Sequence, residues 1–135
     1  MSARRKARKR ALDFLYEADI RKSIALDLYK SRPVVELSES AYVEELLNGV
    51  SEHLLKIDEL IITYAQGWDL DRMPSIDRNL LRIALFEILW NENLDDKVAV
   101  SEAVSLAKEL STEESSGYIN GVLGRIIALK PSLAL

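Results

Sequence analysis

The residues best suited to binding chemistry gather at the start of the chain. Every charged side chain among residues 1–10 is basic, and the six are Arg4, Arg5, Lys6, Arg8, Lys9 and Arg10. Guanidinium groups pair with phosphate oxygens in a fork geometry and stack on bases, whereas a lysine ammonium acts as a point charge. These ten residues carry +6, while the rest of the chain, with 12 basic and 22 acidic residues, carries −10. The pattern indicates a localised contact with a polyanion, or a terminal tail that only aids solubility.

Composition argues against catalysis and metal binding. The chain has no cysteine and one histidine, His53, so disulfide frameworks, zinc sites and thiol catalysis are excluded. It holds no phosphate-cradling glycine loop and no Ser/His/Asp arrangement, and we interpret His53 as an ordinary surface side chain. We therefore expect no catalytic residue, cofactor or metal ion.

Apolar runs are too short for a membrane protein. None approaches the roughly 18 to 20 residues that cross a bilayer, and the basic start is not followed by the uncharged core of a signal peptide. We expect a soluble cytoplasmic protein without membrane contact.

The spacing of apolar residues predicts helices along nearly the whole chain and no strands. A stripe that begins with Ala7 and Ala11 predicts a first helix over about residues 3–21, so the basic segment belongs to a packed helix. A short helix over about 24–30 should end before Pro33, because the residue before a proline is biased out of the helical region.

The middle of the chain predicts two longer helices. Apolar residues at alternating steps of four and three predict one long helix from Ser38 or Ser40 to Tyr64, with a bend at Gly49. After a break over 67–74, Ser75 can cap a helix that is apolar on nearly all sides. That helix should be the central buried one.

Two further helices complete the predicted all-α fold. Residues 100–110 form an amphipathic pattern, and a last helix should start near Glu113. Ser111 to Glu114 has the form of a capping box, with Thr112 or Ser115 as other candidates for the cap.

Small residues share one face of the last helix, namely Gly117, Gly121, Gly124 and Ala128. Each glycine costs a helix about 1 kcal/mol relative to alanine, so a compensating gain is expected. We predict close approach of another helix at Gly121 and Gly124. For Gly117 two alternatives stand: it packs against another helix in the same way, or its bare backbone contacts a ligand.

Three stretches of the sequence carry a family resemblance. They are residues 3–8 (ARRKAR) with Leu15 and Tyr16, residues 68–89 (WDLDRMPSIDRNLLRIALFEIL), and residues 97–123, which hold KVAVSEA, LAK and YINGVL. In this order and spacing they resemble the NusB family of bacterial transcription antitermination factors. The resemblance implies an all-α, NusB-like fold of about seven helices in two small packed bundles, over about 1–66 and 67–135 of a single domain.

The resemblance also implies a function and partners. Members of this family bind the boxA element of leader and ribosomal RNA transcripts as a single strand. They pair with NusE, a small-subunit ribosomal protein, in a complex that keeps RNA polymerase from terminating. Some relatives dimerise, which leaves a homodimer open. The alternative from another class is a helical protein-interaction scaffold or homodimer that does not bind RNA directly.

The first predicted helix is expected to contact RNA. The resemblance assigns this role to its basic residues, namely Arg4, Arg5, Lys6 and Arg8. Lys9 and Tyr16 share a face with Arg5, because the three lie at steps of four and seven. Tyr16 can therefore stack on an unpaired base beside the cations. A tyrosine at the edge of the core with a bonded hydroxyl is the alternative.

The last helix supplies a second set of expected RNA contacts. Glu114, Gly117 and Tyr118 match family positions implicated in RNA contact. Exposed amides at a helix start can receive phosphate, and Tyr118 can stack on a base. Glu114 either accepts a base amino group or only caps the helix.

The expected NusE contacts lie on the central helix. The resemblance points to Asp77 and Glu87 as acidic contacts, joined by Arg78, although such charges are often solvated surface without a partner. We assign Trp68, Phe86 and Ile119 to the core.

Overall fold

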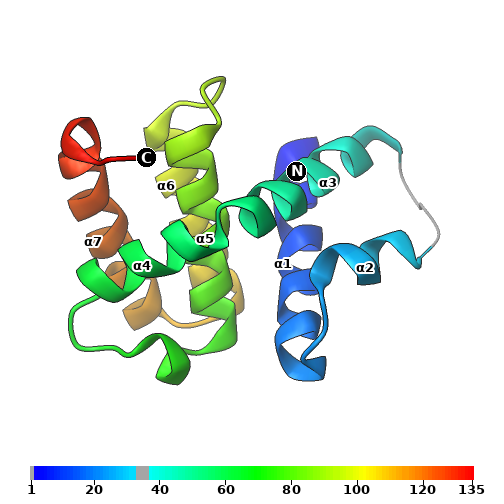
Figure 1. Cartoon of the computed structure of the whole chain (residues 1–135), viewed down its shortest axis with the longest axis horizontal. Helices are drawn as coiled ribbons and strands as arrows, with labels where there is room; N and C mark the ends of the chain where they lie inside the picture. Colours follow the sequence, from blue (N-terminus) through cyan, green and yellow to red (C-terminus); the bar gives the residue numbers. More distant parts are fainter. Residues whose placement is uncertain (1, 33–36) are drawn as a thin grey trace.

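A computed structural model of the chain describes residues 2–32 and 37–135, and most of them are helical (Figure 1). The α-helices are α1 (Ala3–Arg21), α2 (Ala25–Lys30), α3 (Leu37–Glu52), α4 (Leu54–Tyr64), α5 (Ser75–Trp90), α6 (Asp96–Leu110) and α7 (Glu113–Leu129), with short 3₁₀ turns η1 (Leu70–Arg72) and η2 (Lys130–Ser132). No strand occurs in these two ranges, so the all-α prediction is confirmed. Pro33 lies outside the described residues.

The helices pack in two groups that share one core (Figure 1). Helices α1, α2 and α3 pack on one another, and α5, α6 and α7 form the second group. Helix α4 packs on α5 and α7, so it belongs with the second group, and the division falls at His53. Helix α5 also packs on α1 and α3, which joins the two groups.

Helix α5 is the central buried helix, as predicted. Leu80, Leu81 and Leu85 are each at most 1 % exposed, and the aromatic ring of Phe86 is buried as well. A helix that is apolar on every side can bury every side only if neighbours surround it. In this protein those neighbours are the helices of both groups.

The predicted single long helix is wrong, because the chain breaks at His53 into α3 and α4. The His53 ring stacks on the Trp90 ring at the end of α5, with centroids 3.9 Å apart and planes 8° apart. His53 is therefore half-buried at a helix junction, and its interpretation as an ordinary surface residue is corrected.

Close helix packing occurs at a glycine where we did not predict it and is absent at two glycines where we did. Gly49 lies inside α3 rather than at a bend, and a Cβ atom there would overlap the Phe86 ring. In contrast, a Cβ at Gly124 would meet nothing within 4 Å, and one at Gly121 would meet only the Arg125 guanidinium at 3.9 Å. The predicted helix contact at Gly121 and Gly124 is therefore wrong, and Gly49 is the position where two helices approach closely.

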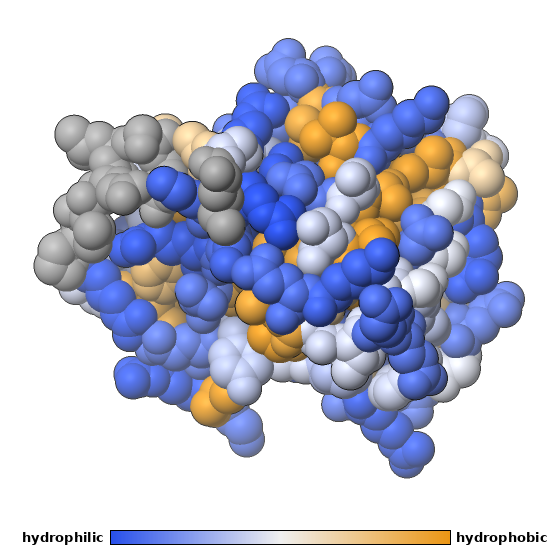
Figure 2. Space-filling view, turned by 180° about the vertical axis from the view of Figure 1, so that it is seen from behind, coloured by the Kyte–Doolittle hydropathy of each residue, from blue (hydrophilic) through white to orange (hydrophobic). Residues whose placement is uncertain are grey.

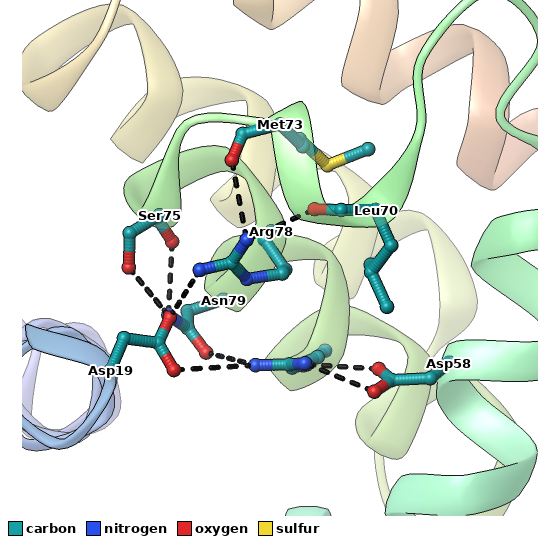
Figure 3. A network of polar contacts seen from close by, with 8 residues as sticks. Asp19, Asp58, Leu70, Met73, Ser75, Arg78 and Asn79 are labelled. Carbon is teal, nitrogen blue, oxygen red and sulfur yellow. Dashed lines mark hydrogen bonds and ion pairs between the residues drawn. The ribbon is translucent and has the colours of Figure 1, made fainter. Parts of the chain in front are cut away.

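A polar network ties α1 to the start of α5 (Figure 3). Asp19 Oδ2 accepts hydrogen bonds from Ser75 Oγ at 2.7 Å, Arg78 Nη2 at 2.7 Å and Asn79 Nδ2 at 2.8 Å. Burial raises the pKa of Asp19, but these hydrogen bonds outweigh burial, so the pKa lies below its ordinary value. Ser75 thus bonds to α1 and does not cap α5, which is a correction, since Pro74 holds the cap position.

The same network holds the segment before α5 and the helix α4. Arg78 Nη1 donates to the Leu70 carbonyl in η1 at 2.9 Å, and Arg82 pairs with Asp58 of α4 through bonds of 2.9 and 3.0 Å. The loop from Tyr64 to Ser75 is therefore anchored at its η1 turn, close to the residues of the pocket described below.

We predict that Gly49→Ala lowers the free energy of unfolding by about 1 to 3 kcal/mol, because the added methyl group overlaps the Phe86 ring. Gly124→Ala is the matched control, since its methyl group enters open space and alanine favours the helix by up to about 1 kcal/mol. Urea unfolding of both variants measures the difference. A wild-type midpoint for Gly49→Ala would contradict the close approach of α3 and α5.

We predict that Asp19→Asn costs about 1 to 3 kcal/mol at neutral pH, because three donors lose a charged acceptor. The folded-state pKa of Asp19 is lowered, so its contribution is complete above the ordinary value and is lost as the pH falls through the folded value. Urea unfolding from about pH 7 to about pH 3 should show the wild type converging on the variant. A gap that does not narrow would contradict an ionised Asp19.

Candidate functional site

Cations of α1 face acids of α6 across the interface of the two helices. Arg5 Nη1 lies 2.8 Å from Glu102 Oε2, and Arg5 Nη2 lies 3.1 Å from Glu109 Oε2. Lys9 Nζ donates to Glu109 Oε1 at 2.7 Å. These side chains are partly exposed, so both cations remain at the surface while they are paired.

Arg8 lies in the interior, which corrects its predicted role as an open RNA contact. Its side chain is 3 % exposed, and Nε donates to both carboxylate oxygens of Glu87 at 3.1 and 3.0 Å. Glu87 is 1 % exposed and also accepts from the Tyr42 hydroxyl. Burial and the neighbouring Glu87 raise the pKa of Tyr42, so the phenol stays protonated as a donor. Glu87 is thus equally inaccessible to a protein partner, contrary to its predicted role.

Three of the predicted α1 residues are open to solvent. Arg4 and Lys6 are exposed, and the Arg4 guanidinium lies 5.0 Å from the centre of the Tyr42 ring. Tyr16 is 40 % exposed, and no hydrogen bond of its hydroxyl is found in the described part of the chain. Below, the cationic face denotes the accessible cations around the first turns of α1, namely Arg4, Arg5, Lys6 and Lys9, of which Arg5 and Lys9 lie toward α6 and Arg4 lies over Tyr42 of α3.

A second candidate region is a pocket of about 480 Å³ between the first turns of α5 and α7. We call it the aromatic pocket, and its lining residues are Trp68, Met73, Pro74, Asp77, Ser111, Thr112, Glu114, Ser115 and Tyr118. The rings of Trp68 and Tyr118 lie 6.0 Å apart and are tilted by 56°. Trp68 is 44 % exposed, so its assignment to the core is wrong, whereas that of Ile119 is confirmed.

The aromatic pocket holds buried polar atoms without partners. Asp77 is 4 % exposed, and its Oδ2 accepts from Ser115 Oγ at 2.7 Å. Its Oδ1 and the hydroxyl of Tyr118 are buried and lack hydrogen-bond partners among the described residues. Burial raises the pKa of Tyr118, which keeps its hydroxyl protonated. An unpaired buried polar group costs about 1 to 3 kcal/mol, so these two atoms of the pocket wall would gain from hydrogen bonds to a polar ligand once the pocket opens to admit one.

Two of the predicted partner residues are thus placed differently by the structure. Asp77 is not a surface charge but lines the aromatic pocket beside Tyr118. Arg78 is 16 % exposed and is already bonded to Asp19 and Leu70. The sequence marked Ser115 only as a possible cap, and its bond to Asp77 was missed because the two residues lie 38 positions apart.

The start of α7 is capped by Thr112, one of the predicted candidates. Thr112 Oγ1 accepts from the Ser115 amide at 2.9 Å, so the predicted box from Ser111 to Glu114 does not form. Glu114 is exposed and lines the aromatic pocket, and Gly117 is exposed with open space where a Cβ would lie. The first turn of α7 is therefore accessible.

A larger groove of about 820 Å³ runs between α6 and α7, with Val100, Val104, Gly124 and Ile127 among its lining residues. The face turned away in Figure 1 is mostly hydrophilic, with hydrophobic side chains gathered in a strip (Figure 2). None of the unpaired buried polar atoms found in the described ranges belongs to this groove. The aromatic pocket, although smaller, is therefore the better candidate for a polar ligand.

Comparison with known proteins identifies the family. The model of the NusB family matches residues 5–128. The chain belongs to the NusB family. A transcription antitermination protein NusB from Arthrobacter sp. (strain FB24) is 54 % identical over 134 residues, which cover 98 % of each chain. This makes the chain a transcription antitermination factor of the NusB type.

Solved structures share the fold of this NusB-family chain. T. maritima NusB matches with a TM-score of 0.85 at 28 % identity, over 96 % of this chain and 97 % of that one. A chain from a crystal structure of NusB and NusE with double-stranded RNA has a TM-score of 0.82 at 24 % identity, over 95 % and 98 %. The predicted NusB-like fold is confirmed. Within the described ranges, no helix has the length and apolar character needed to span a membrane.

We predict that Arg8→Ala lowers the free energy of unfolding by about 3 to 5 kcal/mol, because it leaves Glu87 charged and unpaired in the interior. Arg4→Ala is the matched control, because it deletes the same side chain from an exposed position of the same helix and should cost no more than about 1 kcal/mol, the value of its contact with the Tyr42 ring. Urea unfolding followed by circular dichroism compares the two. Equal midpoints would contradict a structural role for Arg8.

Proposed function

We propose that this chain binds single-stranded boxA RNA of ribosomal RNA leader transcripts. Together with NusE, it would join the complex that keeps RNA polymerase from terminating early. The observation that carries the RNA-binding proposal is the aromatic pocket, which combines two aromatic rings with a buried, unpaired carboxylate oxygen of Asp77. Family membership supports the antitermination role.

The cationic face of α1 suits the phosphates of the RNA. Arg4 and Lys6 are exposed at the surface, with Arg4 over the Tyr42 ring, and Arg5 and Lys9 are partly exposed. Phosphate contacts provide affinity and orientation but carry little sequence information. The cationic face therefore accounts for general RNA affinity, and selectivity needs another site.

The aromatic pocket suits an unstacked base. Aromatic rings bind base faces, and sequence-specific RNA recognition usually targets splayed-out single strands. Asp77 Oδ1 is a potential acceptor for a base amino or imino group and the Tyr118 hydroxyl a potential donor, but both atoms are closed to solvent, so a base reaches them only when the pocket opens. The pocket also lies at the amino-terminal turns of α5 and α7, but the carboxylates of Asp77 and Glu114 in its lining outweigh the partial positive charge of the helix ends, so the pocket suits a base rather than a phosphate.

The two regions lie close along the chain. Glu109, which contacts Arg5 and Lys9, is three residues before Thr112 of the aromatic pocket, so their Cα atoms are at most about 11 Å apart. This closeness supports one continuous RNA surface built from α1 and the start of α7.

NusE is the proposed protein partner. The chain outside residues 1–10 carries −10, which suits a basic ribosomal protein. A chain of the same fold was crystallised with NusE and double-stranded RNA. Since Asp77, Arg78 and Glu87 are buried or already bonded, we leave the NusE face unassigned. The proposed role is binding without catalysis, in the bacterial cytoplasm where transcripts are made.

We predict that boxA RNA binds more tightly than a scrambled RNA and that two variants separate charge from base recognition. Arg4→Ala should weaken both RNAs and reduce the log–log salt slope by about 0.7 if one phosphate contact is lost. Tyr118→Ala should cost about 1 to 3 kcal/mol on boxA RNA, with little change in slope and a smaller gap to the scrambled RNA. Fluorescence anisotropy at several salt concentrations, with and without NusE, measures the affinity of the wild type and of both variants for each RNA.

Lys30→Ala is the control for Arg4→Ala, because it removes the same charge from an exposed position at the end of α2. Unfolding curves confirm that each variant is folded. If Arg4→Ala and Tyr118→Ala both bind boxA RNA like the wild type, the proposed RNA surface is wrong. NusE binding by the wild type without any RNA binding would instead favour the protein-scaffold alternative.

A further inference from the structure

Helix α6 presents two glutamates to the cations of α1. Glu102 and Glu109 lie seven residues apart, so they share one face of α6. Arg5 reaches both carboxylates, at 2.8 and 3.1 Å, and Lys9 reaches Glu109 at 2.7 Å. Half of the cationic face is therefore already bound to carboxylates of the same chain.

The two glutamates are held in different ways. Glu102 also bonds to the buried Arg8 at 3.0 Å and is 21 % exposed, so it belongs to the interior network. Glu109 is 41 % exposed, and its ion pairs within the described ranges are those with Arg5 and Lys9. The hydrogen bond from Lys9 is the main cause that lowers the pKa of Glu109. Glu109 is thus an ionised carboxylate that can be displaced without disturbing the interior.

A carboxylate and a phosphate make the same kind of contact with these cations. Both present negatively charged oxygens that pair with guanidinium and ammonium groups at similar distances. One cation cannot give its best contacts to both anions at once. Exposed ion pairs contribute little stability, so a phosphate can replace the carboxylate of Glu109 at modest cost.

We propose that Glu109 is a built-in competitor of RNA phosphate, an inference that rests on the proposed RNA-binding function. In the free protein, its carboxylate occupies Arg5 and Lys9, and an RNA phosphate must displace it. Glu109 therefore lowers the sequence-independent part of RNA affinity. Binding then depends more on the base contacts that boxA RNA makes in the aromatic pocket.

The test is the affinity of Glu109→Gln for boxA RNA and for a scrambled RNA. The variant should bind both RNAs about two- to tenfold more tightly, the range expected from removing one or two exposed ion pairs. The gain should shrink as salt is added, since salt screens the lost pair. Glu92→Gln removes the same charge from an exposed position after α5, has no ion pair in the described part of the chain, and should leave affinity unchanged.

A double-mutant cycle separates direct competition from a general effect of charge. In a Lys9→Gln background, the gain from Glu109→Gln should fall, because one of the cations that Glu109 occupies is gone. An equal gain in both backgrounds would mean that Glu109 acts through net charge and would overturn the proposal. Unfolding midpoints of all four proteins serve as the folding control.

The remaining outcomes are also decisive. Weaker RNA binding by Glu109→Gln would show that Glu109 positions the cations for RNA, and unchanged binding would show no competition. Either result overturns the proposal while leaving RNA binding by the wild type intact. If the wild type shows no salt-sensitive RNA binding, with or without NusE, the proposed function itself fails.

Discussion

The buried ion pair between Arg8 and Glu87 is the constraint on which the placement of α1 depends. Bringing two charges into the interior costs several kcal/mol per ion, and this cost is offset only where hydrogen bonds satisfy both groups. Arg8 Nη1 donates to Glu102 and the Tyr42 hydroxyl donates to Glu87, while Arg8 Nη2 lies 2.9 Å from Glu87 Oε2 as an ion pair without a well-formed hydrogen bond among the described residues. Because these groups come from α1, α3, α5 and α6, the pair can form in only one arrangement of the four helices. The first helix is therefore held in a fixed orientation on the second group.

This constraint turns a basic segment into an ordered surface. With Arg8 directed inward, Arg5 one turn earlier meets α6, while Arg4 lies over the Tyr42 ring at the surface. Ala7 and Ala11 are fully buried beside them and leave room for close helix contact. A terminal tail would lose conformational entropy on binding RNA, whereas these cations are already positioned on a packed helix. The interpretation of the segment as a solubilising tail does not fit this packing.

Local features of this fold could be predicted from sequence, and long-range pairings could not. The Ala7 and Ala11 stripe indicated the extent of α1, because helical periodicity is visible within a few turns. Arg8 is buried because it pairs with Glu87, which is 79 residues away in the sequence. Within the basic run nothing distinguishes Arg8 from its exposed neighbours, so an accessible side chain was predicted. The roles of the glycines also depend on distant residues, since Gly49 and Gly124 are both helical but only Gly49 faces an aromatic ring. What lies opposite a residue decides its role, and the sequence pattern does not contain that information.

The junction between α6 and α7 shows how charge and base recognition are related in space. Helix α6 ends at Leu110 with the negative end of its dipole, and Glu109 adds a carboxylate there. Helix α7 begins at Glu113 with the positive end of its dipole, capped by Thr112 at the edge of the aromatic pocket. Glu113 and Glu114 in the first turn of α7 offset this positive end, so the junction carries acidic side chains on both sides. An RNA strand that contacts both the cationic face and the aromatic pocket must pass this junction. Its phosphates are opposed at Glu109 and again by the carboxylates of the first turn of α7, so a strand gains most when a base enters the pocket.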